Sequence, residues 1–142
     1  MKKRVNDKIK EISMYLRQLM IIKPKSFDKY SNDFKSKAAC ERYFERISES
    51  LSDLAVLVIK EKGFPLPDES NDCFEVLGKE NIVDSDLTRK MKEMKGMRNI
   101  IAHQYGSIDN ELVYSAIDKE LGKDVKTFIK IIEQLFVEED LR

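Results

Sequence analysis

The chain has 142 residues, and its basic side chains (26) equal its acidic ones (26), so its formal net charge is zero. This length is enough for one hydrophobic core, and we expect a single domain over residues 1–142. A neutral chain is not expected to coat nucleic acid or a membrane through bulk charge, although a local basic site remains compatible with it.

The cysteine and histidine content argues against a metal site. Cys40 and Cys73 do not have the spacing of metal ligands, and His103 is the only histidine. We therefore expect no metal and no cofactor, and the low cysteine content fits the reducing cytoplasm. The basic N-terminal segment lacks the continuous apolar run of a signal peptide, and no apolar run reaches the length of a membrane span.

Helical periodicity predicts two helical segments in the first half of the chain. The apolar stripe of the first is formed by Val5, Ile9, Ile12, Leu16 and Leu19. Pro24 closes this helix, and Ser26 is a suitable N-cap for the next segment. That segment runs from about Phe27 to Lys62, with a candidate break near Asn32, and Gly63 ends it. Its clearest stripe consists of Phe44, Ile47, Leu51, Leu54 and Val58.

The second half is also predicted to be helical. A short helix spans Asp72 to Lys79 and buries Phe74 and Leu77, and a longer helix begins near Ser85 as its cap. The last helix starts at Asp109. Its apolar stripe consists of Val113, Ile117, Leu121, Val125, Phe128, Ile132 and Leu135. Since no segment alternates with a period of two, we expect an all-α bundle of four main helices plus a short one.

An arginine interrupts the apolar face of the helix that begins near Ser85. The apolar side chains that share this face, at about 100° per residue, are Leu87, Met91, Met94 and Ile101. Arg98 falls in the middle of the face, where a guanidinium is unfavourable unless it is paired or binds an anion. His103 lies about 140° away from Arg98, so the two cannot meet on one straight helix. Either the helix ends between them, or the arginine of one copy meets the histidine of another.

Ordinary structural roles are open for each of these residues. Arg98 can form a structural ion pair with Glu49 or Asp53, which are four residues apart and share an otherwise solvated helix face. His103 can cap a helix C-terminus, and Tyr105 can be a buried tyrosine with a tethered hydroxyl. The basic side chains that precede the arginine can equally form a solvated helix face.

The run RNIIAHQY, residues 98–105, resembles the R-x4-H-x-Y signature of HEPN domains, and its context is similar to the HepT toxins. Glu49 and Asp53 resemble the acidic pair on the long helix of that family. The stretch after the long helix, with its prolines at positions 65 and 67, is similar to the family's connector. The resemblance covers nearly the whole chain.

The resemblance implies an up-and-down HEPN-type helical bundle that forms a homodimer, with a composite site at the dimer axis. It implies a toxin of a toxin–antitoxin system that cleaves RNA without a metal. The implied partner is a minimal nucleotidyltransferase (MNT) antitoxin, which would neutralise the toxin by transferring AMP to Tyr105.

The residue types suit this chemistry, because attack by the ribose 2′-hydroxyl needs a proton relay and a cation for the charged phosphorane. His103 is the natural acid and base, and the planar fork of Arg98 matches phosphate oxygens. Asn99 either positions that arginine or is a polar surface residue. Glu49 and Asp53 would orient the arginine across the dimer or tune the histidine.

Two other functions remain open at this stage. The chain can be a non-catalytic subunit that binds nucleotide or substrate for a minimal nucleotidyltransferase, or a helical dimer without any site. No aromatic stacking platform or base-reading motif is visible in the sequence, so it does not predict which RNA is cut.

Overall fold

The computed structural model describes residues 2–68, 72–103 and 108–140, and within these residues it contains helices and no β-strand. The four long helices of this part are α1 (Lys2–Ile22), α3 (Phe34–Lys62), α5 (Ser85–His103) and α7 (Gly122–Asp140). The shorter ones are α2 (Phe27–Asn32), α4 (Cys73–Lys79), α6 (Asn110–Ser115) and the π-helical segment η1 (Ala116–Leu121). The prediction of an all-α fold is confirmed.

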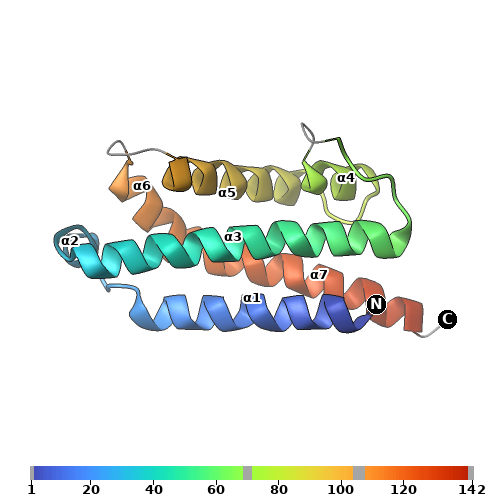
Figure 1. Cartoon of the computed structure of the whole chain (residues 1–142), viewed down its shortest axis with the longest axis horizontal. Coiled ribbons are helices and arrows are strands. Elements are labelled where there is room, and N and C mark those ends of the chain that lie inside the picture. The colour runs from blue at the N-terminus through green and yellow to red at the C-terminus, as the bar shows by residue number, and fades with distance from the viewer. Residues whose placement is uncertain (1, 69–71, 104–107, 141–142) are drawn as a thin grey trace.

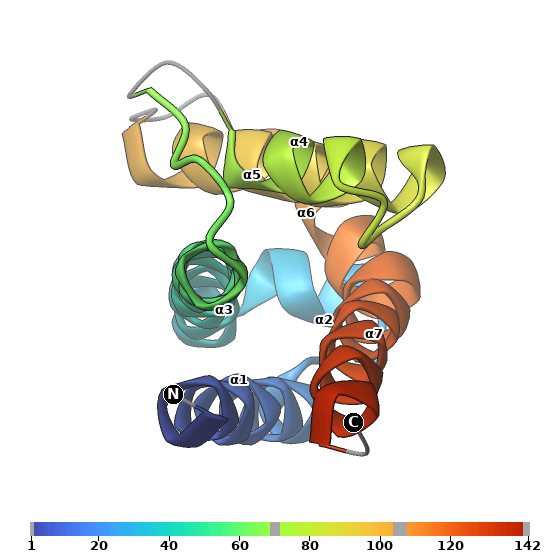
Figure 2. The ribbon, with the colours of Figure 1, turned by 90° about the vertical axis from the view of Figure 1, so that its right-hand side faces the viewer.

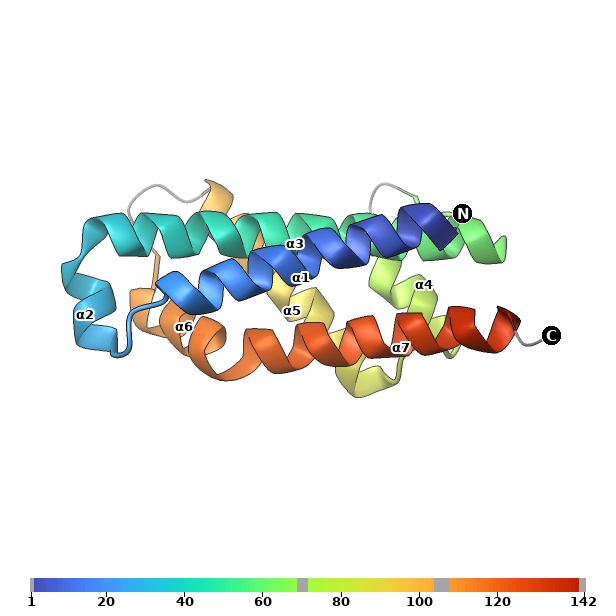
Figure 3. The same ribbon diagram turned by 90° about the horizontal axis from the view of Figure 1, so that it is seen from below.

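The long helices alternate in direction along the bundle. In Figure 1, α1 and α5 run towards the end that carries α2 and α6, whereas α3 and α7 run back towards the end where both termini lie. Seen end-on in Figure 2, α3 lies between α1 on one side and the layer of α4 and α5 on the other, with α7 opposite α3. Seen from below in Figure 3, α1 crosses α3 at a shallow angle. The motif end of α5 therefore lies at the α2 and α6 end of the bundle.

Side-chain caps set the helix boundaries. Ser26 Oγ accepts a hydrogen bond from the backbone N–H of Lys29 (3.2 Å), as predicted for an N-cap. The break in the long helical region falls at Asp33, which caps α3 through the backbone N–H of Lys35 (3.1 Å). Ser85 is the first helical residue and not the cap that we expected. Asp84 takes that role, because its carboxylate accepts from the backbone N–H of Leu87 (2.8 Å).

The predicted apolar stripes form one core, and the buried residues differ from the prediction only at the C-terminal end of the last stripe. Leu135 is partly buried, and Phe136 is buried in its place. The last helix is also not continuous, because η1 separates α6 from α7. Residues that repeat every four positions drift about 40° per step around an α-helix, and the wider π turn compensates for that drift. Three such steps link Val113 to Val125, and η1 lies between them.

None of the described helices is both long enough and apolar enough to cross a membrane.

Candidate active site

Arg98 and His103 of the motif lie on one uninterrupted helix. Since α5 extends from Ser85 to His103, it does not end between Arg98 and His103, and that alternative is wrong. His103 follows Arg98 by five positions, which separates the two side chains by about 7.5 Å along the helix axis and about 140° around it. They therefore point to different sides of α5 within one protomer.

Arg98 is held at the contact between α5 and α3. Its side chain is 27% exposed, on the face that also buries Met94 and Ile101. Nη2 donates to Oε1 of Glu49 on α3 (2.6 Å), and Nη1 donates to Oδ1 of Asn99 (3.0 Å). The ion pair with Glu49 that the sequence allowed is therefore formed. A guanidinium has five N–H donors, so these two bonds leave others available to an anion.

The Nε–H of the same guanidinium is buried and has no hydrogen-bond partner among the described residues. An unpaired buried donor is unfavourable, so the site is only partly satisfied in the isolated chain.

The two acidic candidates have different partners. Glu49 contacts Arg98, whereas the Asp53 carboxylate lies 3.7 Å from Nζ of Lys8 on α1 and is 64% exposed. Lys8 also donates to Glu11 (2.7 Å), and this hydrogen bond raises the pKa of the lysine. Within one protomer, Asp53 therefore does not orient the arginine.

His103 is the last residue of α5 and is exposed. Its imidazole forms no hydrogen bond or ion pair with another residue in the described ranges. Asn99 and Ile100 on the preceding turn are exposed too, so this side of the helix is open to a substrate or a second protein. Tyr105 lies outside the described residues.

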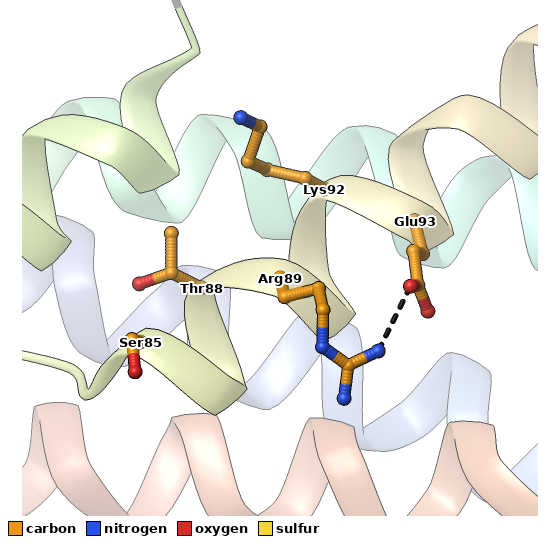
Figure 4. A pocket seen from close by; sticks show the side chains of 5 residues that line it. All are labelled: Ser85, Thr88, Arg89, Lys92 and Glu93. Carbon is orange, nitrogen blue, oxygen red and sulfur yellow. Dashed lines mark hydrogen bonds and ion pairs between the residues drawn. The ribbon is translucent and has the colours of Figure 1, made fainter.

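The basic residues that precede the motif are largely neutralised. Arg89 pairs with Asp86 (2.8 Å) and Glu93 (2.9 Å), and Lys92 pairs with Glu75 on α4. A shallow hollow of about 450 Å³ lies over this part of α5, and Figure 4 shows the side chains that line it, among them the ion pair of Arg89 and Glu93. These ion pairs support the interpretation of the basic residues as a solvated helix face, so we do not assign a site to the hollow.

A second hollow, of about 360 Å³, lies between α1 and α3 and was missed from the sequence. Its lining residues are Tyr15, Ala39, Arg42, Tyr43 and Arg46. Four of them follow each other on α3 at steps of three, one and three residues, which places cations and an aromatic ring on one side of that helix. That spacing is the signal that could have revealed it. The other ring comes from α1, which only the fold brings into place.

The comparisons with known proteins agree on the fold. A solved structure described as a tri-AMPylated HEPN toxin of Shewanella oneidensis in complex with MNT antitoxin has a TM-score of 0.86 at 23% identity, covering 94% of this chain and 99% of that one. A structure described as the cytosolic protein YutE of Bacillus subtilis has a TM-score of 0.80 at 16% identity, covering 97% and 92%. The HEPN-type bundle expected from the motif is thereby confirmed.

Sequence relatives agree as well. The mRNA nuclease HepT of Shewanella oneidensis is 26% identical over 104 residues, 73% of this chain and 77% of that protein. The tRNA nuclease HepT of Aphanizomenon flos-aquae is 25% identical over 113 residues, 80% of this chain and 77% of that protein. The family described as "Ribonuclease HepT-like" matches residues 6–133. The chain therefore belongs to the HepT-like ribonuclease family.

Proposed function

We propose that this protein is the toxin of a toxin–antitoxin pair and a metal-independent endoribonuclease. Family membership and the nuclease names of its relatives support an enzyme that cuts RNA. The observation that carries the proposal is the arrangement of Arg98 and His103 on the single helix α5, with the guanidinium held by Glu49 and the imidazole exposed. This arrangement supplies an anion-binding fork and a free acid–base group, but it does not bring them together within one chain.

A homodimer solves this geometric problem. Two copies that pack around the motif end of α5 would place two guanidiniums and two imidazoles around one phosphodiester. Exposed Ile100 on the same helix is an apolar group that such packing would cover. Residues 1–142 then form one HEPN-type domain per protomer.

The proposed reaction is a transesterification within the RNA. One His103 accepts the proton of a ribose 2′-hydroxyl while its oxygen forms a bond to the adjacent phosphorus. The bond from phosphorus to O5′ breaks, and the other His103 donates a proton to that oxygen. Arg98 stabilises the charged phosphorane with its remaining N–H donors. The products are a 2′,3′-cyclic phosphate and a 5′-hydroxyl.

Glu49 and Asn99 are positioning residues in this scheme, because each accepts a hydrogen bond from the guanidinium of Arg98. Asp53 contacts Lys8, so it would take part only from the opposite protomer.

We also propose that a minimal nucleotidyltransferase is the antitoxin and that it transfers AMP to Tyr105. Solved toxin–antitoxin complexes of similar fold, one described as tri-AMPylated, support this partner. An AMP group two residues from His103 would place a bulky anion beside the cationic site and exclude RNA. The cytoplasm, where both RNA and ATP are present, is the expected location.

Cleavage of single-stranded RNA in excess EDTA tests the proposal. We expect the wild-type protein to cleave and the Arg98→Ala and His103→Ala variants to lose at least about a hundredfold in rate. Arg17→Ala, which removes an exposed arginine of α1, is the matched control and should cleave like the wild type. Product ends with a 3′-hydroxyl, or a monomer that cleaves, would contradict the mechanism. Absence of cleavage with tight binding of a nucleotidyltransferase would instead favour a non-catalytic partner subunit.

A further inference from the structure

The hollow between α1 and α3 combines aromatic rings with guanidinium groups. We call it the tyrosine–arginine groove, and its lining residues are Tyr15 from α1 and Ala39, Arg42, Tyr43 and Arg46 from α3. The two helices lie side by side along much of their length, as Figures 1 and 3 show.

The two tyrosine rings are held in place but remain partly exposed. Their centroids lie 6.3 Å apart with an edge-on geometry of 67°. The hydroxyl of Tyr43 donates to Oε1 of Gln18 (2.9 Å), and that of Tyr15 donates to Oε1 of Glu11 (3.3 Å). Since both polar ends are tethered, the rings offer fixed apolar surface to a flat ligand.

The two arginines differ in how far they are neutralised. Nη1 of Arg42 lies 3.5 Å from the carboxylate of Glu45. Arg46 has no carboxylate within ion-pair distance in the described part of the chain, and its Nη1 donates to the hydroxyl of Tyr15 (3.3 Å). Its guanidinium carbon lies 5.8 Å from the centre of that ring. Arg46 is thus a positioned cation that keeps N–H donors free for a phosphate.

Arg46 of the groove lies close along α3 to Glu49, the residue that holds Arg98. Arg46 and Glu49 are three residues apart on α3, so they are neighbours on the helix surface. Glu49 in turn accepts the 2.6 Å hydrogen bond from Arg98. From Arg42 to Glu49 the distance along the axis of α3 is about 10 Å, and both lie on the same side of it.

We propose that the tyrosine–arginine groove binds a nucleotide of single-stranded RNA next to the scissile phosphate. The base stacks on the ring of Tyr15, and a backbone phosphate pairs with Arg46. A duplex does not fit this chemistry, because its bases are already stacked and cannot reach the rings. The inference rests on the proposed ribonuclease function, for which it names a binding subsite.

Binding of a 2′-O-methylated single-stranded oligonucleotide, about 12 nucleotides long, tests the subsite independently of cleavage, since this RNA lacks the attacking hydroxyl. We expect Tyr15→Leu and Arg46→Gln each to raise its Kd about tenfold. Arg46→Gln should also lower the salt dependence of binding by about 0.7 in the slope of log K against log salt. Tyr15→Phe keeps the ring but loses the hydroxyl that accepts from Arg46, so its Kd should rise by less than that of Tyr15→Leu. Arg17→Gln, which removes an exposed cation elsewhere on α1, should bind like the wild type.

With unmodified RNA, the same two groove variants should raise KM and leave kcat close to that of the wild type. Wild-type Kd values in both variants, or no binding by the wild-type protein, would overturn the subsite. If either groove variant changes from dimer to monomer in size-exclusion chromatography, the proposed subsite is also overturned, since the groove would then be an interface between copies. Failure of the wild type to cleave RNA, with the expected Kd changes retained, would refute the ribonuclease function and not the RNA-binding groove.

Discussion

The guanidinium of Arg98 and the carboxylate of Glu49 join α5 to α3 across 2.6 Å. The pair explains how an arginine can occupy the apolar face of α5, because its charge is met by a carboxylate at the edge of the core. With the Glu49 side chain 44% exposed, the pair contributes little to stability. Its effect is to fix the direction of the guanidinium fork, which otherwise rotates on a long side chain.

The first prediction concerns the two carboxylates of α3. We expect Glu49→Ala to lower kcat/KM for RNA cleavage about tenfold or more, because Arg98 loses the contact that orients it. Glu49→Gln keeps a hydrogen-bond acceptor for Arg98, so its kcat/KM should fall by less than that of Glu49→Ala. Asp53→Ala should stay within about twofold of the wild type, since its carboxylate contacts Lys8. Initial cleavage rates, with melting temperatures as a check on folding, decide the comparison.

A loss in Asp53→Ala as large as that in Glu49→Ala would contradict this assignment. It would indicate that Asp53 reaches the arginine of the other protomer, which is the arrangement that the sequence resemblance allowed.

Periodicity predicted the bundle because burial repeats with the helix period. The stripe from Val5 to Leu19 and the one from Phe44 to Val58 are buried as expected. The π-helical segment η1 was not predicted. Its sequence, AIDKEL, contains no residue that breaks an α-helix, and only the packing of the whole C-terminal stripe requires a wider turn.

The part of the candidate site that lies on the single helix α5 was predictable from the sequence. Counting residues placed Arg98 on the apolar face and His103 away from it, and the structure agrees. The choice between Glu49 and Asp53 was not predictable, because both lie on the same side of α3 and the position of α5 decides which one the arginine reaches. The tyrosine–arginine groove was missed for a similar reason, since its rings come from two helices.

Two buried tyrosines, Tyr30 and Tyr114, pack with their ring centroids 5.1 Å apart. Tyr114 donates its hydroxyl hydrogen to the carbonyl of Pro24 (2.7 Å), whereas the hydroxyl of Tyr30 is buried without a partner among the described residues. Burial raises the pKa of the Tyr30 phenol, as expected for a group whose charged form is excluded from water.

Tyr114→Phe should lower the free energy of unfolding by about 1 kcal/mol, because it leaves the carbonyl of Pro24 unpaired. Tyr30→Phe should leave this free energy unchanged or raise it by up to about 1 kcal/mol, since an unsatisfied hydroxyl is removed from the core. Urea unfolding followed by circular dichroism measures both. Equal destabilisation by the two variants would imply that Tyr30 bonds to a buried water molecule.

The third prediction concerns two helical glycines that differ in the space around them. A Cβ at Gly96 in α5 meets nothing within 4 Å, so alanine fits there without strain. Because glycine in a helix interior is less favourable than alanine, Gly96→Ala should raise the free energy of unfolding by about 0.5–1 kcal/mol.

A Cβ at Gly78 in α4 would lie 2.7 Å from Oγ1 of Thr88. That hydroxyl donates to the carbonyl of Asp84 (2.8 Å), so Thr88 cannot move away without losing the bond. Gly78→Ala should therefore lower the free energy of unfolding by about 1–3 kcal/mol. The midpoints of thermal and urea unfolding should rise in Gly96→Ala and fall in Gly78→Ala. If both shift downwards, another surface already packs against α5 at Gly96 in the folded protein.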